Sequence, residues 1–195
     1  MMKKITLLAT MLFVASMGAY AQDEYPKFEL AGTFNFVRAD LDVFGNESIY
    51  GYGIGAQYNA NKYFGIVGEW TAAHGTSGPA SIVQDGVTYD IPEFDTRVQT
   101  LMAGPRFSYR PKAVTVFGHW LLGAGTNKID WGTSSYTKWQ FAMAIGGGVD
   151  VNVSKHFAIR AVQIDWMPIH SNLELQGANN YFNNIRYQFG GVIKF

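Results

Sequence analysis

Isolated charges stand within otherwise apolar, glycine-rich stretches of this chain. In "YFGIVGEW", Glu69 is the single charge among apolar, aromatic and glycine residues. An unpaired carboxylate in such surroundings is costly, so it must face water, a partner cation or a reaction centre. Arginine suits the partner role because its planar guanidinium can bind a carboxylate through a pair of hydrogen bonds. The residues that could form one such polar network are Glu29, Glu69, Arg106, His119, Arg160, Gln163, Asp165 and Arg186.

Histidines could indicate catalysis or metal binding, but their positions favour neither. His74, His119, His156 and His170 lie in four different segments, without the spacing of metal ligands. The chain has no cysteine, which excludes a thiolate ligand or nucleophile. It also has no Gly-x-Ser-x-Gly motif, and the adjacent residues His170 and Ser171 cannot by themselves form a serine–histidine pair. We therefore predict no catalytic residue, no metal and no cofactor, and we assign His119 a hydrogen-bonding role.

Composition restricts the class of protein. The 195 residues include 22 glycines and 15% aromatic residues, and only 15% are charged, compared with about 25% in typical globular domains. The formal net charge is zero and no basic run is present, so the chain gives no indication of nucleic-acid binding. The length suits one domain and a leader.

The first residues have the organisation of a secretory signal peptide. The basic "MMKK" is followed by the apolar "ITLLATMLFVASM", and "AYA" precedes Gln22 as a small-x-small cleavage site. A membrane anchor is the weaker interpretation, because the apolar run is shorter than the ~20 residues that a spanning helix needs. We expect residues 1–21 to be removed by cleavage near Ala21, which leaves residues 22–195 as a domain outside the cytoplasm.

Beyond residue 27, large and small residues alternate with a period of two, which predicts β-strands. Eight segments of roughly ten residues show this pattern, as "IYGYGIGAQYN" illustrates. Short connections ("NANK", "RPKA" and "NVSK") alternate with longer ones at about 39–48, 73–95, 126–138 and 168–181. An even number of strands with short turns at one rim and longer loops at the other is typical of transmembrane barrels.

One face of each predicted strand is large and apolar, and the other face is small or polar. An eight-stranded barrel has an interior only wide enough to be filled by side chains, so the bulky face cannot fit inside. We therefore predict an all-β fold, an eight-stranded antiparallel up-and-down transmembrane β-barrel, with the apolar face toward lipid and the small or polar face toward a hydrated lumen. A soluble ligand-binding barrel, with the faces reversed, is the alternative.

The segment "FAIRAVQIDWM" breaks the alternation. Arg160 and Asp165 are separated by an odd number of residues, so a regular strand cannot direct both into the lumen. A β-bulge near Ala161 and Val162 would place Arg160, Gln163 and Asp165 on the inner face. The alternative is that Asp165 lies above the bilayer.

Aromatic residues recur near both ends of the predicted strands, as expected of the belts at the two membrane interfaces. Those near the short turns are Phe28, Tyr58, Phe64, Tyr109, Phe157 and Phe195. Those near the longer loops are Phe36, Tyr50, Trp70 and Trp166.

Residues 27–195 resemble the small outer-membrane β-barrel domain family, whose members include the eight-stranded transmembrane domain of outer membrane protein A. The similarity lies in "GPRFSY", in "GGGVDVNVSKHFAIRAVQIDW" with its inward arginine and aspartate, and in "RYQFGGVIKF". It implies localisation in the outer membrane of a diderm bacterium, with outer-membrane lipid as surroundings. The end of the chain looks like the signal read by the outer-membrane assembly machinery, carried here by Tyr187, Phe189, Ile193 and Phe195.

A barrel of this kind can host several functions. We predict a monomer with both termini in the periplasm and a structural or surface-interaction role, in which the loop at 73–95 is the best candidate to contact an unknown extracellular ligand. We expect an ion-pair and hydrogen-bond network to close the lumen, with Glu69 paired to Arg106 because their strands are neighbours. The alternatives are a narrow pore for ions or small solutes and an outer-membrane lipid-modifying enzyme, which the pair His170 and Ser171 would suggest.

Overall fold

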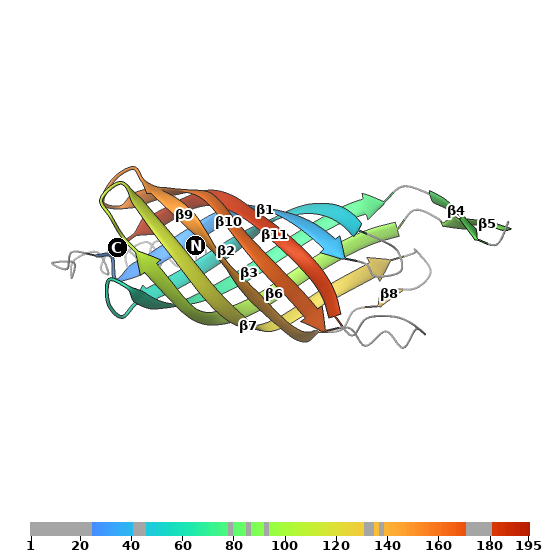
Figure 1. Cartoon of the computed structure of the whole chain (residues 1–195), viewed down its shortest axis with the longest axis horizontal. Coiled ribbons are helices and arrows are strands. Elements are labelled where there is room, and N and C mark those ends of the chain that lie inside the picture. The colour runs from blue at the N-terminus through green and yellow to red at the C-terminus, as the bar shows by residue number, and fades with distance from the viewer. Residues whose placement is uncertain are drawn as a thin grey trace, which may run out of the picture.

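The fold is an antiparallel β-barrel (Figure 1). The computed structural model describes residues 25–40, 46–77, 80–84, 87–91, 94–130, 135–136, 139–170 and 181–195. Within these ranges no helix is long and apolar enough to cross a membrane. The strands of the barrel are β1 (Phe28–Asp40), β2 (Asn46–Asn59), β3 (Phe64–Ser77), β6 (Phe94–Tyr109), β7 (Val114–Asp130), β9 (Gln140–Asn152), β10 (Phe157–His170) and β11 (Tyr181–Lys194).

Each of these strands pairs with the next along the chain, and β1 pairs with β11 to close the ring. The closure confirms the predicted eight-stranded antiparallel up-and-down barrel. It also leaves the ring without a free strand edge, which is the condition for a β-structure to span lipid.

Three short strands lie outside the ring. β4 (Ala80–Gln84) and β5 (Val87–Ile91) pair with each other as a two-stranded sheet between β3 and β6. β8 (Ser135–Tyr136) pairs with the end of β7. Figure 1 shows all three at the rim opposite the short turns, with the β4–β5 hairpin extending away from the barrel.

The barrel strands are longer than we predicted from the sequence. They contain 13 to 17 residues, and they continue into each of the four predicted loops, so the predicted loop boundaries were wrong. The segment at 73–95, for example, contains the end of β3, the β4–β5 hairpin and the start of β6, and the β3–β6 pairing continues to Ser77 and Phe94. The reason is that backbone pairing does not need an apolar outer face, whereas the sequence pattern ends where that face becomes polar.

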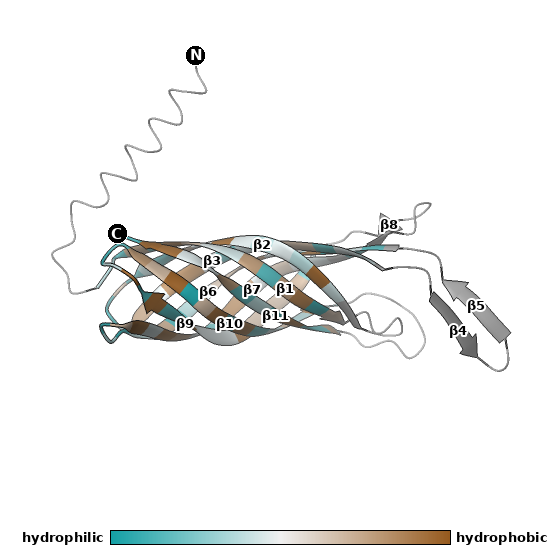
Figure 2. Cartoon of the chain, turned by 90° about the horizontal axis from the view of Figure 1, so that it is seen from above, coloured by the Kyte–Doolittle hydropathy of each residue, from teal (hydrophilic) through white to brown (hydrophobic). Residues whose placement is uncertain are grey.

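The outer face of the barrel wall is apolar, and glycines alternate with its large residues in β2. In β2, Tyr52 and Ile54 are 61% and 63% exposed, whereas Gly53 between them is buried. Figure 2 shows hydrophobic and hydrophilic residues interleaved along the strands. The outer face therefore has the character that lipid requires, and the small inner residues leave room for longer side chains from neighbouring strands.

β10 contains the irregularity expected from the sequence. Its register with β11 shifts between Arg160 and Gln163, and Ala161 and Val162 both lie exposed on the outer side. The bulge restores inward orientation, so Arg160, Gln163 and Asp165 are all buried.

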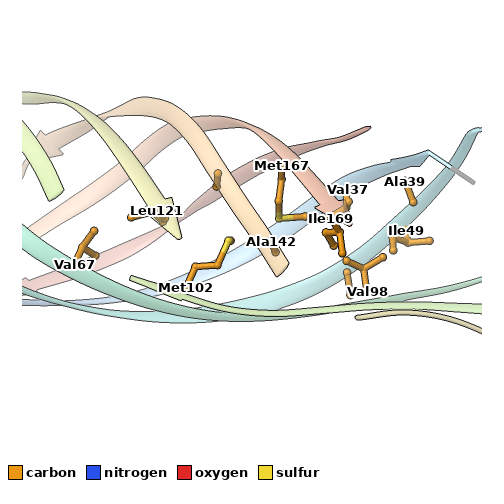
Figure 3. Packing of buried hydrophobic residues seen from close by; sticks show 12 residues of the cluster. Val37, Ala39, Ile49, Val67, Val98, Met102, Leu121, Ala142, Met167 and Ile169 are labelled. Atoms are coloured by element: carbon orange, nitrogen blue, oxygen red, sulfur yellow. The ribbon is translucent and has the colours of Figure 1, made fainter. Parts of the chain in front are cut away.

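The lumen is not polar along its whole length, which corrects the sequence-based expectation of a small or polar, hydrated interior. A cluster of buried apolar side chains fills much of the half nearer the longer connections and extends to Val67, on the short-turn side of Glu69 (Figure 3). Its larger members are Val37, Ile49, Val67, Val98, Met102, Leu121, Met167 and Ile169. These residues have the inward parity of their strands, and an interior of eight strands is filled by side chains whether they are polar or aliphatic.

Candidate functional site

The centre of the lumen is built around Glu69 of β3, which two arginines hold. Arg106 Nη2 lies 2.8 Å from Glu69 Oε1, and Arg186 Nη2 lies 3.0 Å from Glu69 Oε2. Glu69 is 3% exposed and Arg186 is 0% exposed, so neither charge reaches bulk water. The Glu69–Arg106 contact joins neighbouring strands, whereas Arg186 reaches Glu69 across the lumen from β11.

Asp165 of β10 connects Arg186 to His119. Its Oδ2 lies 2.6 Å from Arg186 Nη2, and its Oδ1 lies 2.8 Å from His119 Nε2. On the other side of the imidazole, His119 Nδ1 lies 3.0 Å from Arg106 Nη2. A guanidinium can only donate, so Nδ1 must accept and Nε2 must donate to Asp165. His119 is therefore neutral in this arrangement, and both of its nitrogens are occupied.

A second arm of the network lies nearer the short turns. Arg160 binds Asp150 through two hydrogen bonds, Nε to Oδ1 at 2.8 Å and Nη2 to Oδ2 at 3.2 Å. Arg160 Nη1 also donates to Gln163 Oε1 at 2.8 Å, and Gln163 Nε2 donates to Asp165 Oδ2 at 2.8 Å. The two arms therefore form one continuous network.

One aromatic ring contacts two of the guanidiniums. The centroid of Phe117 on β7 lies 4.3 Å from Arg106 Cζ and 4.7 Å from Arg160 Cζ. Each contact is within the range of cation–π attraction. Phe117 thus lowers the cost of placing two cations close together in the lumen.

The rim with the short turns has its own ion pair. Glu29 Oε1 lies 2.6 Å from Arg110 Nη1 and accepts a hydrogen bond from Asn59 Nδ2 at 2.9 Å. Asn59 Oδ1 accepts from Arg110 Nη2 at 3.0 Å and from Gln57 Nε2 at 2.6 Å. The structure therefore pairs Glu29 with a residue outside the predicted set rather than with one of its arginines.

The structure brings seven of the eight predicted polar residues into the centre of the network and places Glu29 at the rim. Asn59 and Gln57 link the rim to the centre, because Arg106 Nη1 donates to Gln57 Oε1 at 3.0 Å. Sequence reasoning did not include Asp150, Arg110, Asn59, Gln57 and Phe117 in the network. Asp150 and Phe117 have inward parity and could have been included, but Arg110 lies in a predicted turn, where no parity applies.

The central network is balanced in charge. Glu69, Asp150 and Asp165 face Arg106, Arg160 and Arg186. Two cavities of about 10 Å³ lie between these groups, one lined by Gln57 and Arg106 and one by Thr71 and Gln188. Each has room for about one water molecule. No group of three or more histidine, aspartate or glutamate side chains in the described ranges could hold a metal ion.

The remaining histidines lie far from this network in the fold. His74 is exposed at the outer face of β3, and His156 is exposed in the turn before β10. His170 lies at the end of β10, with Nδ1 3.4 Å from Gln140 Oε1, and its neighbour Ser171 lies outside the described residues.

The structure places the predicted aromatic belts on the outer face. Tyr50, Tyr58, Tyr109, Phe157 and Trp166 are exposed, and the partly exposed members are Phe28, Phe36, Phe64, Trp70 and Phe195. Rings of neighbouring strands contact one another, as the pairs Phe28–Tyr58 and Phe36–Tyr50 show at opposite ends of β1 and β2.

The residues of the predicted assembly signal also lie on the outer face. Tyr187, Phe189 and Ile193 are exposed on β11, and Phe195 N donates to Phe28 O at 2.9 Å. Their recognition by the assembly machinery stays a prediction.

Comparisons with known proteins agree with this geometry. The model of the outer membrane protein beta-barrel domain family matches residues 6–192, so the chain belongs to this family. It is an integral outer-membrane β-barrel protein. A search of curated proteins finds no match.

Solved structures show the same fold at low sequence identity. Neisserial surface protein A is 14% identical with a TM-score of 0.66, and the match covers 89% of this chain and 100% of that one. OprG from Pseudomonas aeruginosa is 15% identical with a TM-score of 0.55, covering 88% and 96%. Ail, the attachment invasion locus protein of Yersinia pestis, is 16% identical with a TM-score of 0.54, covering 88% and 99%.

The pairing of Glu69 with Arg106 predicts strong coupling between these residues. Glu69→Ala leaves the Arg106 guanidinium without its carboxylate, and Arg106→Ala removes one of the two cations that hold Glu69. In the double variant Arg186 is still held by Asp165. We expect the double variant to be more stable than the sum of the single losses by about 1–3 kcal/mol, measured by urea unfolding in lipid vesicles. Additive losses would contradict the coupling.

Proposed function

We propose that this protein is a non-enzymatic, monomeric barrel whose lumen is closed and whose longer connections form an extracellular interaction surface. In this proposal the short turns and both ends of the mature chain lie in the periplasm, after cleavage near Ala21. The observation that carries the closed lumen is the charge-balanced network, in which each carboxylate is held by an arginine.

The apolar cluster supports the same conclusion. Met102, Leu121 and Met167 are 0–1% exposed. On their strands they lie nearer the longer connections than Arg106, His119 and Asp165, which belong to the network. Ions that passed the network would have to cross this aliphatic region without water, which is costly. The lumen thus has a polar barrier and an apolar barrier in series.

The β4–β5 hairpin supports an interaction role. These strands pair with each other, and the described sheet has no third strand. A two-stranded sheet alone is marginally stable in water, and its open edges can pair with another chain. Two relatives of the same fold are described as a surface protein and as an attachment invasion locus protein. We infer that the hairpin contacts an extracellular partner.

Planar-bilayer recording tests the closed lumen. The wild-type protein should give no unitary currents, because both barriers are intact. A variant that combines Arg106→Ala and Glu69→Ala with Met102→Ala and Leu121→Ala should conduct, since it shortens both barriers. The matched controls are the two double variants, Arg106→Ala with Glu69→Ala and Met102→Ala with Leu121→Ala. Each leaves one barrier intact and should give no unitary currents. Steady unitary currents from the wild-type protein would favour the narrow pore instead.

The absence of enzymatic activity is tested separately. We expect the lipid A of cells that produce the protein to be unchanged in acyl chains and phosphates, because both His119 nitrogens are engaged in the network. New lipid A species that depend on His170 and Ser171 would support the lipid-modifying alternative.

A further inference from the structure

Three basic residues lie side by side on the outer face of the barrel, at the rim with the longer connections. His74 of β3 is directly opposite Arg97 of β6, and Arg97 is directly opposite Lys128 of β7. Residues directly opposite in an antiparallel pair project from the same face of the sheet and are about 5 Å apart. His74 and Arg97 are exposed and Lys128 is partly exposed. We call these three residues the basic row.

The basic row lies at the outer boundary of the apolar band. Below His74, the outer face of β3 carries Ala72, Trp70, Gly68, Ile66 and Phe64. Phe64 is ten residues from His74 and is directly opposite Phe107, which is ten residues from Arg97. Ten residues span roughly 33 Å along a strand, or about 25 Å along the membrane normal at the usual tilt. An apolar band of this height places the basic row where lipid head groups begin.

Two acidic residues, Asp95 of β6 and Asp130 of β7, lie directly opposite each other on the side of the basic row away from the membrane. Asp95 lies one position farther from the membrane on the same face of β6, and its Oδ1 accepts a hydrogen bond from Thr76 at 2.6 Å. Arg38 on β1 is a separate cation, directly opposite Ser48 and Ile185. On β11, the outer-face residues near this rim are Tyr181 and Asn183. The basic row on β3, β6 and β7 therefore lies on the membrane side of this acidic pair.

We propose that His74, Arg97 and Lys128 bind the phosphate groups of the lipid that surrounds this rim. Phosphate matches the row in charge and depth, and the arginine fork can bind two phosphate oxygens at once. The spacing lets neighbouring side chains share one phosphate group. With the orientation of the proposed function, this lipid is the phosphorylated glycolipid of the outer leaflet. The row would then fix the barrel's depth and hold an ordered lipid beside β6.

Lipid retention by the full-length mature protein tests this proposal. The protein is reconstituted in nanodiscs of a neutral phospholipid with a small fraction of lipid A, extracted into detergent, and its bound lipid is measured by native mass spectrometry. Triple substitution of the row, His74→Gln, Arg97→Gln and Lys128→Gln, should reduce retained lipid A by about tenfold or more, since each cation near an anionic lipid surface contributes. Heat-modifiable gel migration verifies that the variant is folded.

Matched controls separate this site from general electrostatics. Lys62→Gln, Lys112→Gln and Lys155→Gln remove three exposed cations at the short turns, and they should leave retention unchanged. Dephosphorylated lipid A should be retained no better by the wild-type protein than by the triple variant, and millimolar inorganic phosphate should not displace the lipid. Equal retention of lipid A by the wild-type protein and the triple variant would overturn the proposal, as would equal retention of the dephosphorylated lipid.

The result is independent of the closed-lumen proposal. Nanodiscs present lipid A in both leaflets, so binding does not depend on which rim is extracellular. The substitutions lie on the outer face and leave the lumen network intact, so conductance tests the lumen and lipid retention tests the basic row.

Discussion

Arg186→Met is expected to cost the folded barrel about 3–5 kcal/mol, the usual range for removing one partner of a buried ion pair. Arg186 is 0% exposed, and its Nη2 lies 2.6 Å from Asp165 Oδ2 and 3.0 Å from Glu69 Oε2. Methionine fills much of the same space but leaves two carboxylates with one cation fewer. The free energy of unfolding in lipid vesicles, followed by tryptophan fluorescence during urea titration, measures the loss.

A second substitution shows whether charge is the cause. Adding Glu69→Gln to Arg186→Met removes one of the two carboxylates that lost their cation, so it should recover part of the stability. Lys155→Met, in an exposed turn, controls for the loss of a cation at the surface and should change stability by less than about 0.5 kcal/mol. If Arg186→Met were as mild as Lys155→Met, the network would not stabilise the barrel.

The alternation of large apolar residues with small or polar ones predicts most of the fold. Because the side-chain period of a strand is two, the tyrosines of "IYGYGIGAQYN" fix both the strand and its outer face. The bulge in β10 was predictable for the same reason, since Arg160 and Asp165 could not otherwise both face inward. The strand ends were not predictable, because His74 and Arg97 are polar on the outer face yet remain paired.

The partners within the lumen depend on three-dimensional closure. Parity places Asp150 and Arg160 inside, but their pairing follows from the register in which they lie directly opposite each other. Arg110 follows β6 in a short turn and still reaches Glu29 on β1, which is not adjacent to β6 in the ring. The sequence therefore identifies which side chains enter the lumen more securely than which of them meet.

The apolar half of the lumen shows a different limit. Met102 has the same parity as Arg106, and Leu121 the same parity as His119, so the alternation places both inside. A hydrated lumen was the wrong premise, because it left no role for aliphatic side chains on the inner face. In the structure most of the aliphatic cluster lies nearer the longer connections than the ion pairs, although Met102 is directly opposite Glu69.

Gly146→Ala is expected to destabilise the barrel by about 3 kcal/mol, at the upper end of the cost of overpacking. Gly146 of β9 is directly opposite both His119 of β7 and Asp165 of β10. The His119–Asp165 hydrogen bond therefore crosses the lumen face of β9 where this residue has no side chain. A Cβ on Gly146 would lie 2.2 Å from Asp165 Oδ1 and 2.2 Å from the backbone oxygen of Ile164. The methyl group and the hydrogen bond cannot occupy this space together.

A glycine on the opposite face provides the matched control. Gly68 of β3 faces outward, and a Cβ there would have no atom within 4 Å. Gly68→Ala should leave stability unchanged or raise it by up to about 1 kcal/mol, because it restricts the unfolded chain without strain. Urea unfolding in vesicles compares the two variants. If Gly146→Ala were as stable as Gly68→Ala, β9 would move aside at no cost, and the glycine would not be needed for His119 to reach Asp165. A loss of stability in Gly146→Ala alone would make this glycine part of the lumen network.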